Sequence, residues 1–353
     1  MKYIRYSIIA TLLLGFSFLF VSGYVKKDET VTFFPTYGYY KDEKLVVDIH
    51  GWIYELEDSS IFRNMFIKTI QLSDKEMRNN PLFKKRMRYF LVDNERGKKI
   101  TIHVGGGSLT LPKSKANGHF SLSMKWNKEQ MQKHIKSGIL PYQLPERKGD
   151  DRKFYGEIHI IEQEGISVIS DIDDTIKISN VLNKKELVRN TLLRPFKEVP
   201  HMPEIYQKWK SQGARFHYVS GSPWQLYPEL RNFFIAKNYP LGSFHLKKFR
   251  IKDSSIIKFL KSNQFKYKAA IIENIIDKFP KRKYILVGDT GEMDAVVYAH
   301  IAKKYKEQII AICIRDVGKT GDSLANYENI FSEVKAKWIL FTDAKDLENI
   351  ELK

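Results

Sequence analysis

The stretch VISDIDDTIK, Val168 to Lys177, places three carboxylates directly behind an apolar run. Asp171, Asp173 and Asp174 fall within four residues. Like charges repel one another and resist burial, so this position needs a reason. The run GISVIS (165–170) lacks polar–apolar alternation, which is typical of a strand covered on both faces. The stretch therefore predicts a buried strand of a parallel sheet that ends in a cluster of acids.

The chain after residue 166 continues with the same pattern. Short apolar runs alternate with amphipathic helical segments, which indicates an α/β layer built on a parallel sheet. The further strand-like runs are ARFHYVSG (214–221), KYILVGD (283–289), QIIAICIRD (308–316) and AKWILFTD (336–343), and the helical segments are PWQLYPELRNFFIAK (223–237), KAAIIENIIDKF (268–279) and DAVVYAHIAKKY (294–305).

Polar residues follow several of these runs at the point where each strand should end. Asp171 follows the first run, Ser220 follows ARFHYV, and Asp289 follows KYILVG. Ligands of such sheets bind at the carboxyl ends of the strands. The acids would then lie at one edge of the sheet, within reach of partners.

Three simpler explanations compete for DIDDT. A calcium loop of the EF-hand type requires glycine at its sixth position and glutamate at its twelfth, where this chain has Ile176 and Leu182. A helix N-cap would use one acid of the three. A solvated turn would need no buried strand before it. Catalysis is the preferred interpretation, because other strand ends also carry polar residues.

The residues in their order resemble the four motifs of the haloacid dehalogenase superfamily of aspartate-nucleophile phosphotransferases. DIDDT resembles the first motif, Ser220 the second and Lys268 the third. GDTGEMD (288–294) resembles the fourth, with its two acids at Asp289 and Asp294.

A closer likeness is to the actin-patch-associated phosphatidate phosphatase family. It is carried by DIDDTIKISNV, VSGSPWQLYPELRNFF, YPLGSFHLKKFR and ILVGDTGEMD, and covers about residues 166 to 320. The segment from about residue 32 more loosely resembles the β-rich module of bacterial relatives. Gly221 departs from the more usual Asn or Ala, and the apolar N-terminus departs from the cytosolic yeast member.

The resemblance implies a mechanism. Asp171 would be the nucleophile that forms an aspartyl-phosphate, and Asp173 the general acid and then the base. A Mg²⁺ ion would be held by the Asp171 carboxylate, the backbone carbonyl of Asp173, and Asp289. Asp294 is also expected at the metal site. It would orient metal-bound waters or Lys268 rather than bind the ion directly.

The remaining site residues follow from the same resemblance. Ser220 and Lys268 would bind the phosphoryl oxygens, and Thr175 would fix the loop by hydrogen bonds. Lys266 lies two residues before Lys268 in a lysine-rich chain, but Lys268 matches the family spacing and leads into the amphipathic helix.

The substrate side of the site is predicted to be open. Only 44 residues, Ile176 to Val219, separate the first two motifs, which allows a small cap. Trp224 and Tyr227 either flank the entrance or, more simply, pack in the core. The basic run LKKFRIK (246–252) suits an anionic lipid surface, and equally a solvated face.

Residues 29–165 have a different pattern, which predicts a β-rich accessory domain. KLVVDIHGWIYELE (44–57), KKITIHV (98–104) and GHFSLSM (118–124) have strand character, and a helical stretch (73–91) interrupts them. GGGS (105–108) predicts a tight turn rather than a phosphate loop. The charged segment LPERKGDDRKF (144–154) is a candidate boundary loop.

The N-terminus predicts export. Lys2 and Arg5 precede the uncharged run IIATLLLGFSFLFV (8–21), which is followed by Ser22 and Gly23 as a weak cleavage site. Residues 1–28 are therefore expected to be a signal peptide or, preferably, an uncleaved membrane anchor. Either would place the rest of the chain on the outer, periplasmic side of the membrane.

Composition limits the function classes. Lys and Arg total 59 against 41 Asp and Glu, a net charge of +18 that favours anionic partners. No RNA-binding aromatic signature or Arg-rich block is present, so no nucleic-acid partner is expected. The lone Cys313 excludes an intramolecular disulfide and a cysteine-based zinc site.

The sequence thus predicts three parts: residues 1–28, the β-rich domain 29–165, and a haloacid dehalogenase-like phosphatase domain 166–353 with a small cap. The expected activity is Mg²⁺-dependent hydrolysis of phosphatidate to diacylglycerol. Two alternatives remain: a phosphatase of a soluble or nucleic-acid phosphomonoester, and a non-catalytic phosphatidate-binding module. Such modules tend to lose the acids, and Asp171 and Asp173 are both present here.

Overall fold

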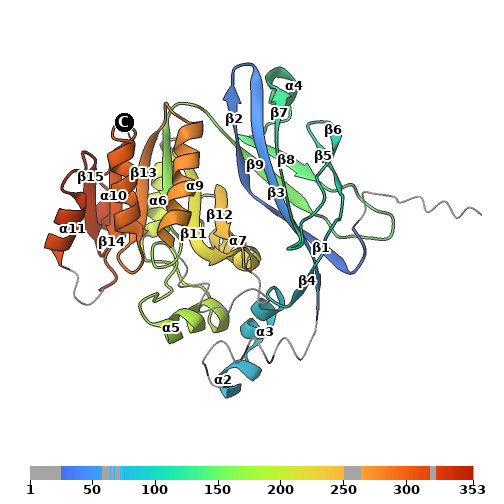
Figure 1. Ribbon diagram of the computed structural model, residues 1–353, viewed down its shortest axis with the longest axis horizontal. Helices are drawn as coiled ribbons and strands as arrows, with labels where there is room; N and C mark the ends of the chain where they lie inside the picture. Colours follow the sequence, from blue (N-terminus) through green and yellow to red (C-terminus); the bar gives the residue numbers. More distant parts are fainter. Residues whose placement is uncertain are drawn as a thin grey trace, which may run out of the picture.

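The computed structural model contains two β-sheets, each with its own helices (Figure 1). It describes residues 25–57, 64, 67, 72, 74–249, 264–318 and 323–352. The sheets follow each other in the chain: the last strand of the first sheet ends at Ile161 and the first strand of the second begins at Ile166.

The second sheet has six parallel strands in the order β12-β11-β10-β13-β14-β15. The chain builds outward from β10 in one direction and then returns to build from β13 in the other. The order therefore reverses between β10 and β13, which is where open α/β sheets bind ligands. The strands are β10 (Ile166–Ser170), β11 (Arg215–Pro223), β12 (Ser243–Lys247), β13 (Lys283–Asp289), β14 (Ile309–Arg315) and β15 (Lys337–Phe341).

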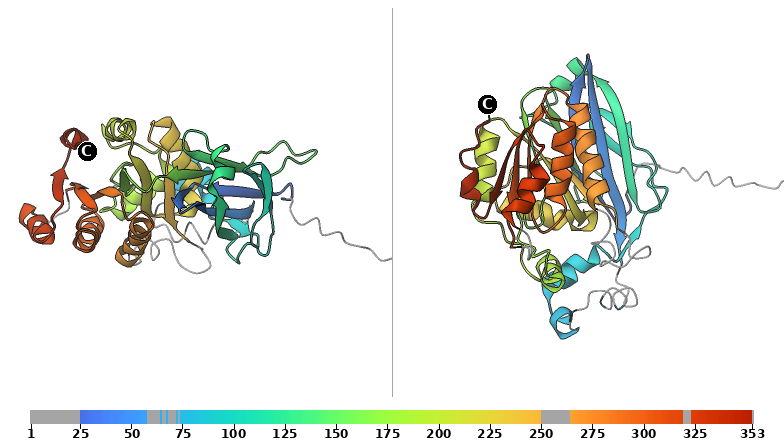
Figure 2. Two further views of the ribbon diagram at one scale, coloured as in Figure 1. Left: turned by 90° about the horizontal axis from the view of Figure 1, so that it is seen from above. Right: turned by 60° about the vertical axis from the view of Figure 1, so that its left-hand side comes forward.

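Helices cover both faces of this sheet (Figure 2). Neighbouring residues of β10 show why its sequence does not alternate, because Val168 packs in one core and Ile169 in the other. The lone Cys313 is buried in β14. One core holds α6 (Met202–Ser211), the short η2 (Trp224–Leu226), α7 (Tyr227–Ala236) and η3 (Ala344–Leu347), and the other holds α9 (Gln264–Lys278), α10 (Asp294–Lys304) and α11 (Leu324–Phe331).

Two short helical segments lie between the acid-rich loop and α6. They are α5 (Lys184–Val188) and the π-helical turn η1 (Arg189–Leu193), together called the α5–η1 segment. Asn183 caps α5 by accepting hydrogen bonds from the backbone of Lys185 and Glu186.

The first sheet is a predominantly antiparallel, nine-stranded sheet around the long strand β3. β3 pairs with β1, β2, β4 and β7, and β9 pairs with β2 in parallel. The strands are β1 (Glu29–Phe34), β2 (Thr36–Lys41), β3 (Lys44–Leu56), β4 (Val92–Asn94), β5 (Thr101–Val104), β6 (Gly107–Thr110), β7 (His119–Asn127), β8 (Ile139–Gln143) and β9 (Tyr155–Ile161).

Local features of this sheet confirm two predictions and correct a third. Gly105 and Gly106 have positive φ in the two-residue turn between β5 and β6, so GGGS forms a hairpin turn. The helical stretch forms as α2 (Asp74–Arg78) and α3 (Pro81–Arg88), and α4 (Lys128–Gln132) adds a short helix. The charged segment 144–154 is no boundary, because it connects β8 to β9 within one sheet.

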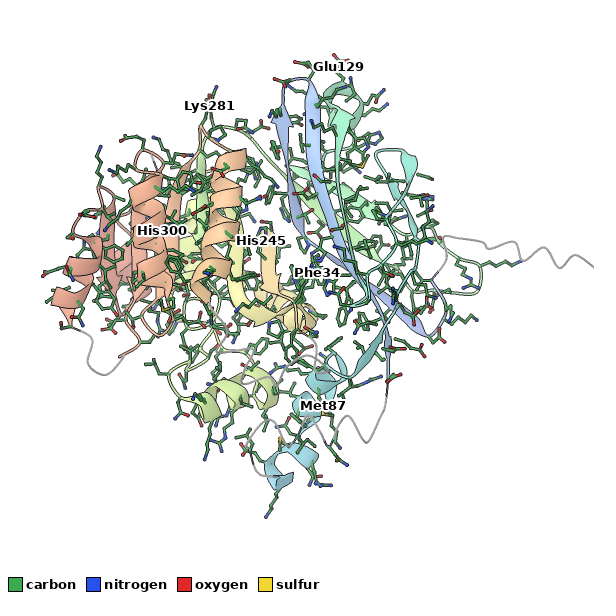
Figure 3. The ribbon with its side chains drawn as sticks, in the orientation of Figure 1. Phe34, Met87, Glu129, His245, Lys281 and His300 are labelled. Atoms are coloured by element: carbon green, nitrogen blue, oxygen red, sulfur yellow. The ribbon has the colours of Figure 1, made fainter. Side chains whose placement is uncertain are left out.

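The two sheets share a core. Phe34 of β1 stacks within 4.0 Å of Trp224, measured between ring centroids, and Figure 3 labels Phe34 at this junction. Tyr227 contacts the same ring edge-on. Trp224 and Tyr227 are therefore packing residues, as the simpler interpretation predicts, and they join the β-rich part to the second sheet.

The predicted location is corrected. Among the residues that the structure describes, no helix has the length and apolar character needed to cross a membrane, so this part of the chain gives no support to the predicted membrane anchor. The predicted signal or anchor, residues 1–28, lies outside the described residues except for its last four positions, 25–28.

Candidate active site

The predicted site residues converge at the carboxyl edge of the parallel sheet. Asp171 follows the last residue of β10, Asp289 is the last residue of β13, and Asp294 is the first residue of α10. Lys268 reaches this edge from α9, and Ser220 from β11. The topology thus explains how residues over 100 positions apart meet.

Asp171 is fully buried, and its backbone N–H donates to the carbonyl oxygen of Val287 at 2.9 Å. Within the described part of the chain neither carboxylate oxygen accepts a hydrogen bond. Lys268 supplies a close cation, because its Nζ lies 3.0 Å from Oδ1 without hydrogen-bond geometry. Burial raises the pKa of Asp171 well above its usual range, and Lys268 opposes this. A buried carboxylate whose oxygens accept no hydrogen bond is unusual and indicates a functional group.

Three buried carboxylates form a cluster. One oxygen from each of Asp171, Asp289 and Asp294 lies within 4.8 Å of the others. Burial, and then the charges of Asp294 and Asp171, raise the pKa of Asp289 well above its usual range. An all-oxygen set of ligands suits a hard cation such as Mg²⁺, and the unbonded oxygens of Asp171 are free to bind one. The residues therefore fit a divalent cation.

Lys268 is the main cation of this cluster. Its Nζ lies 2.5 Å from Asp294 Oδ1 and 3.0 Å from Glu292 Oε2, besides the contact with Asp171. Although burial acts against the charged form, these carboxylates hold the pKa of Lys268 well above its usual range. Lys266 is exposed, so of the two lysines it is Lys268 that lies at the site.

Asp173 has a separate set of partners from the three-acid cluster. Its Oδ1 pairs with Lys177 Nζ at 2.7 Å and accepts from Ser179 Oγ at 2.6 Å. Its Oδ2 accepts from Ser222 Oγ at 2.6 Å and from Ser220 Oγ at 3.3 Å. Despite the effect of burial, Lys177 and the serine hydroxyls lower the pKa of Asp173 to about 2. Asp173 is therefore ionised in this arrangement.

The third acid of the stretch has a different role. Asp174 has a positive φ of 54°, and its carboxylate accepts from the backbone N–H groups of Ser179, Asn180 and Val181 at 2.6–2.9 Å. It therefore holds the turn of the acid-rich loop. Thr175 Oγ1 is 3.5 Å from Asp289 Oδ2, a long contact that joins the loop to β13.

Ser220, the residue that resembles the second motif, lies beside Asp173. Its Oγ accepts from the backbone N–H of Ser222 at 3.0 Å while contacting Asp173. Gly221 follows, and a Cβ at this position would lie 2.7 Å from Oε1 of Gln264. The glycine that departs from the family pattern thus makes room for Gln264, whose Nε2 donates to Glu292 Oε1 at 2.9 Å.

Sequence reasoning missed four residues of the site: Lys177, Ser222, Gln264 and Glu292. Lys177 is the last residue of the stretch DIDDTIK and Glu292 lies inside GDTGEMD, so both residues lie within quoted motif stretches. Their spacing carried no signal, because a lysine or glutamate beside a motif is usually solvated. Only the fold shows that Lys177 is buried.

Comparison with known proteins agrees with this geometry. Residues 166–316 match the family model described as the catalytic domain of phosphatidate phosphatase APP1. Phosphatidate phosphatase APP1 of Saccharomyces cerevisiae is 34% identical over 175 residues, which cover 48% of this chain and 29% of that protein. An uncharacterized protein of Schizosaccharomyces pombe is 34% identical over 170 residues, 47% of this chain and 27% of that protein.

The matched segment spans less than a third of the length of either curated relative. It contains every residue of the site named above. Residues 166–316 are thus similar to the catalytic domain of the APP1 phosphatidate phosphatase family, the likeness that the motifs predicted.

Proposed function

We propose that this protein is a Mg²⁺-dependent phosphatidate phosphatase that acts through an aspartyl-phosphate on Asp171. The observation that carries the proposal is the Asp171 carboxylate, buried among charged groups with no hydrogen bond to its oxygens from any described residue. A structural carboxylate at this depth would be fully bonded. A nucleophile must instead keep a lone pair for the phosphorus atom.

The chain's residues divide the chemistry between them. Asp171 Oδ attacks phosphorus, and the bond from phosphorus to the glyceryl oxygen breaks. Asp173 gives that oxygen its proton, and then takes a proton from the water that attacks the phosphoryl group and frees Asp171. The ionised Asp173 of the structure is ready for the second step. For the first step it needs a proton, and the arriving phosphate dianion raises its pKa from about 2.

Phosphate binding is assigned to Lys268 and Ser220. Lys268 already lies 3.0 Å from Asp171, so it would contact an oxygen of the transferred phosphoryl group. Ser220 Oγ would donate to a second oxygen, and Thr175 keeps the acid-rich loop against β13. Asp294 orients Lys268 through its 2.5 Å contact.

A single lysine cannot neutralise this site. Lys268 faces Asp171, Glu292 and Asp294, and a phosphate dianion would add two further negative charges. We propose that Asp171, Asp289 and the backbone carbonyl of Asp173 hold a Mg²⁺ ion, with Asp294 beside it. Bound there, Mg²⁺ would offset the repulsion between the nucleophile and the phosphate and stabilise charge on the phosphoryl oxygens.

The scaffold we propose is haloacid dehalogenase-like. It comprises an accessory domain, residues 29–165, and a phosphatase domain, residues 166–353, in which the α5–η1 segment is the small cap. The all-parallel order of the six strands and the helices on both faces support this assignment.

The lipid substrate rests on the family match. The net charge of +18 favours an anionic substrate and an anionic lipid surface, and it would also suit a soluble phosphomonoester. A non-catalytic phosphatidate-binding module is disfavoured, because Asp171, Asp173 and Asp289 are all in place.

Phosphate release by the full-length protein tests the proposal. Phosphatidate in detergent micelles and a soluble sugar phosphate are each offered with Mg²⁺ and then with EDTA, beside Asp171→Asn. We expect metal-dependent release from phosphatidate that the substitution abolishes. Release from the sugar phosphate alone would replace the lipid substrate by a soluble ester. Binding of phosphatidate vesicles without any release would replace the enzyme by a binding module.

A further inference from the structure

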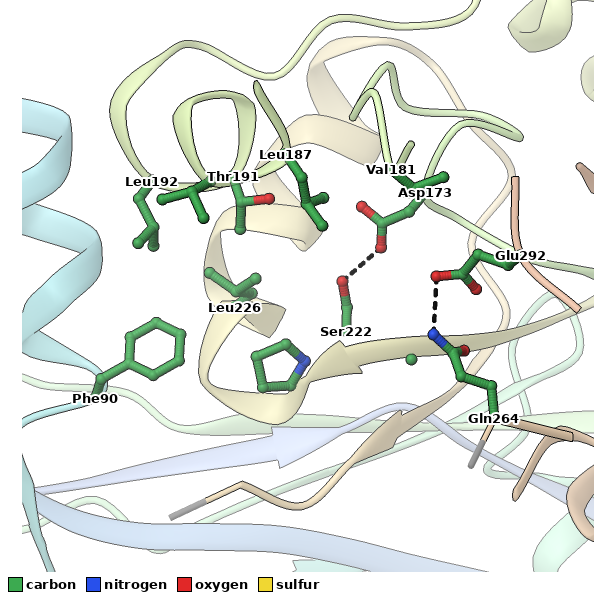
Figure 4. Close-up of a pocket in the computed structure, with 13 residues that line it drawn as sticks. Phe90, Asp173, Val181, Leu187, Thr191, Leu192, Ser222, Leu226, Gln264 and Glu292 are labelled. Carbon is green, nitrogen blue, oxygen red and sulfur yellow. Dashed lines mark hydrogen bonds between the residues drawn. The ribbon is translucent and has the colours of Figure 1, made fainter. Parts of the chain in front are cut away.

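An apolar pocket opens directly beside Asp173 (Figure 4). One side is polar, with Asp173 and Ser222 joined by their hydrogen bond. The other side is mainly hydrocarbon, with the hydroxyl of Thr191 among the apolar side chains. Its apolar lining includes Phe90, Leu187, Val188, Leu192 and Leu226.

The position of the pocket indicates what would enter it. In the proposed reaction Asp173 protonates the leaving oxygen, so the group next to Asp173 is the leaving alcohol. In phosphatidate that alcohol is glycerol esterified to acyl chains. A sugar would bring several hydroxyl groups to a wall of Leu187, Val188 and Leu192, on which the Thr191 hydroxyl is the one polar side-chain group among the described α5–η1 residues that line the pocket. The first methylenes of an acyl chain would instead lose water against this wall.

Part of the pocket wall comes from outside the matched catalytic segment. Phe90 lies just after α3, in the region before the second sheet, and is 6% exposed. The other apolar residues come from the α5–η1 segment and η2. The pocket therefore lies where the end of α3 meets the α5–η1 segment, which contacts α3 through η1 and lies near it in Figure 1.

A buried arginine, Arg86, joins α3 to the α5–η1 segment by hydrogen bonds. Arg86 of α3 donates through Nη1 to the carbonyl oxygens of Thr191, at 2.9 Å, and Arg194, at 2.7 Å. Its Nε donates to Glu229 of α7 at 3.3 Å. These bonds hold the end of the α5–η1 segment against α3, and α3 against α7. Asn80 adds a bond from Nδ2 to the carbonyl oxygen of Leu193 at 2.9 Å.

We propose that this pocket binds the acyl-ester end of the phosphatidate leaving group, and that the β-rich domain is part of the substrate site through Phe90. The proposal rests on the phosphatase activity proposed above and extends it to the substrate's hydrocarbon. Arg86 is then a positioning residue, which acts by holding the α5–η1 segment over the pocket.

The test uses full-length protein and two substrates that share one headgroup. Long-chain phosphatidate in detergent micelles carries the acyl chains, and glycerol 3-phosphate lacks them. Leu187→Asp makes the wall polar. Leu182→Asp is the matched control, because Leu182 is 45% exposed in the same part of the chain and does not line the pocket. Phe90→Trp fills the pocket from the β-rich side.

We expect Leu187→Asp and Phe90→Trp each to raise KM for phosphatidate at least about tenfold, the equivalent of losing about two buried methylene groups. Their kcat/KM for glycerol 3-phosphate should stay within about twofold, and Leu182→Asp should change neither substrate. Thermal unfolding of each variant shows whether it is folded.

Other results would overturn the proposal. Equal losses for both substrates, or equal effects of Leu187→Asp and Leu182→Asp, would remove the acyl pocket while phosphatase activity stands. A folded Phe90→Trp variant with unchanged KM would remove the β-rich domain from the site. Wild-type protein that releases phosphate from neither ester would overturn the proposed function, and the pocket's role with it.

Discussion

Lys268→Met tests how the acid cluster is kept stable in the absence of metal. The lysine lies within 2.5–3.0 Å of Asp171, Glu292 and Asp294, and its removal leaves these buried carboxylates without that cation. Removing one partner of a buried ion pair costs about 3–5 kcal/mol when the remaining charge stays ionised. We therefore expect the free energy of unfolding in EDTA to fall by about 4 kcal/mol at pH 8.

The loss of unfolding free energy caused by Lys268→Met should be smaller at low pH. The pKa values of Asp171 and Glu292 are raised in the folded protein. At a pH between the unfolded and the folded pKa values, the native state therefore binds more protons than the unfolded state. Stability from such groups falls as pH rises through that window. Without Lys268 these pKa values rise further, so the pH range over which the native state binds more protons becomes wider. At pH 5.5 the acids accept protons instead of remaining charged, and we expect a loss of about 2 kcal/mol.

Urea unfolding followed by circular dichroism at the two pH values measures both losses. Lys266→Met is the control, because this lysine is exposed two residues earlier and should change stability by no more than about 0.5 kcal/mol. A loss for Lys268→Met that is equal at pH 5.5 and pH 8, or no larger than that of the control, would refute the reasoning.

Three further changes probe other parts of the site. Lys177→Met should raise the pKa of Asp173 from about 2 toward its usual value. A lowered acid pKa adds folding stability that is lost as pH falls through it, so urea unfolding should show that the variant loses about 2 kcal/mol at pH 7 and less toward pH 3. A loss that does not depend on pH would contradict this. Gly221→Ala should push Gln264 from its bond and cost about 1 kcal/mol, and in a double-mutant cycle Gln264→Ala should remove that cost, whereas additive effects would oppose it. Mg²⁺ at about 100 times its Kd should stabilise the protein by about 2.7 kcal/mol in calorimetry, and Asp289→Asn should remove that gain; an unchanged gain would place the ion elsewhere.

The parallel sheet could be predicted from sequence because its signals are local. Each strand is a short apolar run, and Val168 and Ile169 pack on opposite faces as an unalternating run requires. The convergence of Asp171, Ser220 and Asp289 then follows from topology, since parallel strands end at one edge. The helical stretch 73–91 was predicted as one element and forms as two, α2 and α3. The residue types at the break indicate this, because Asn80 is the N-cap of α3 and Pro81 is its first residue.

The parts that escaped prediction depend on long-range contacts. Arg86 bonds carbonyls over 100 residues away, and nothing in PLFKKRMR distinguishes it from the neighbouring cations. The segment 144–154 has the composition of a linker, yet it connects paired strands, because composition reports solvation and not strand pairing. Lys177 is a buried lysine, and burial of lysine is set by the partner Asp173 and not by local sequence.

The central claim is that Asp171 becomes phosphorylated. Full-length protein is mixed with phosphatidate and Mg²⁺, quenched in acid within one turnover, digested and analysed by mass spectrometry. The account predicts a hydroxylamine-labile phosphoryl group on the peptide that contains Asp171, absent in Asp171→Asn and after EDTA. Diacylglycerol formed at full rate with no phosphoryl group on that peptide, or with an active Asp171→Asn variant, would contradict it.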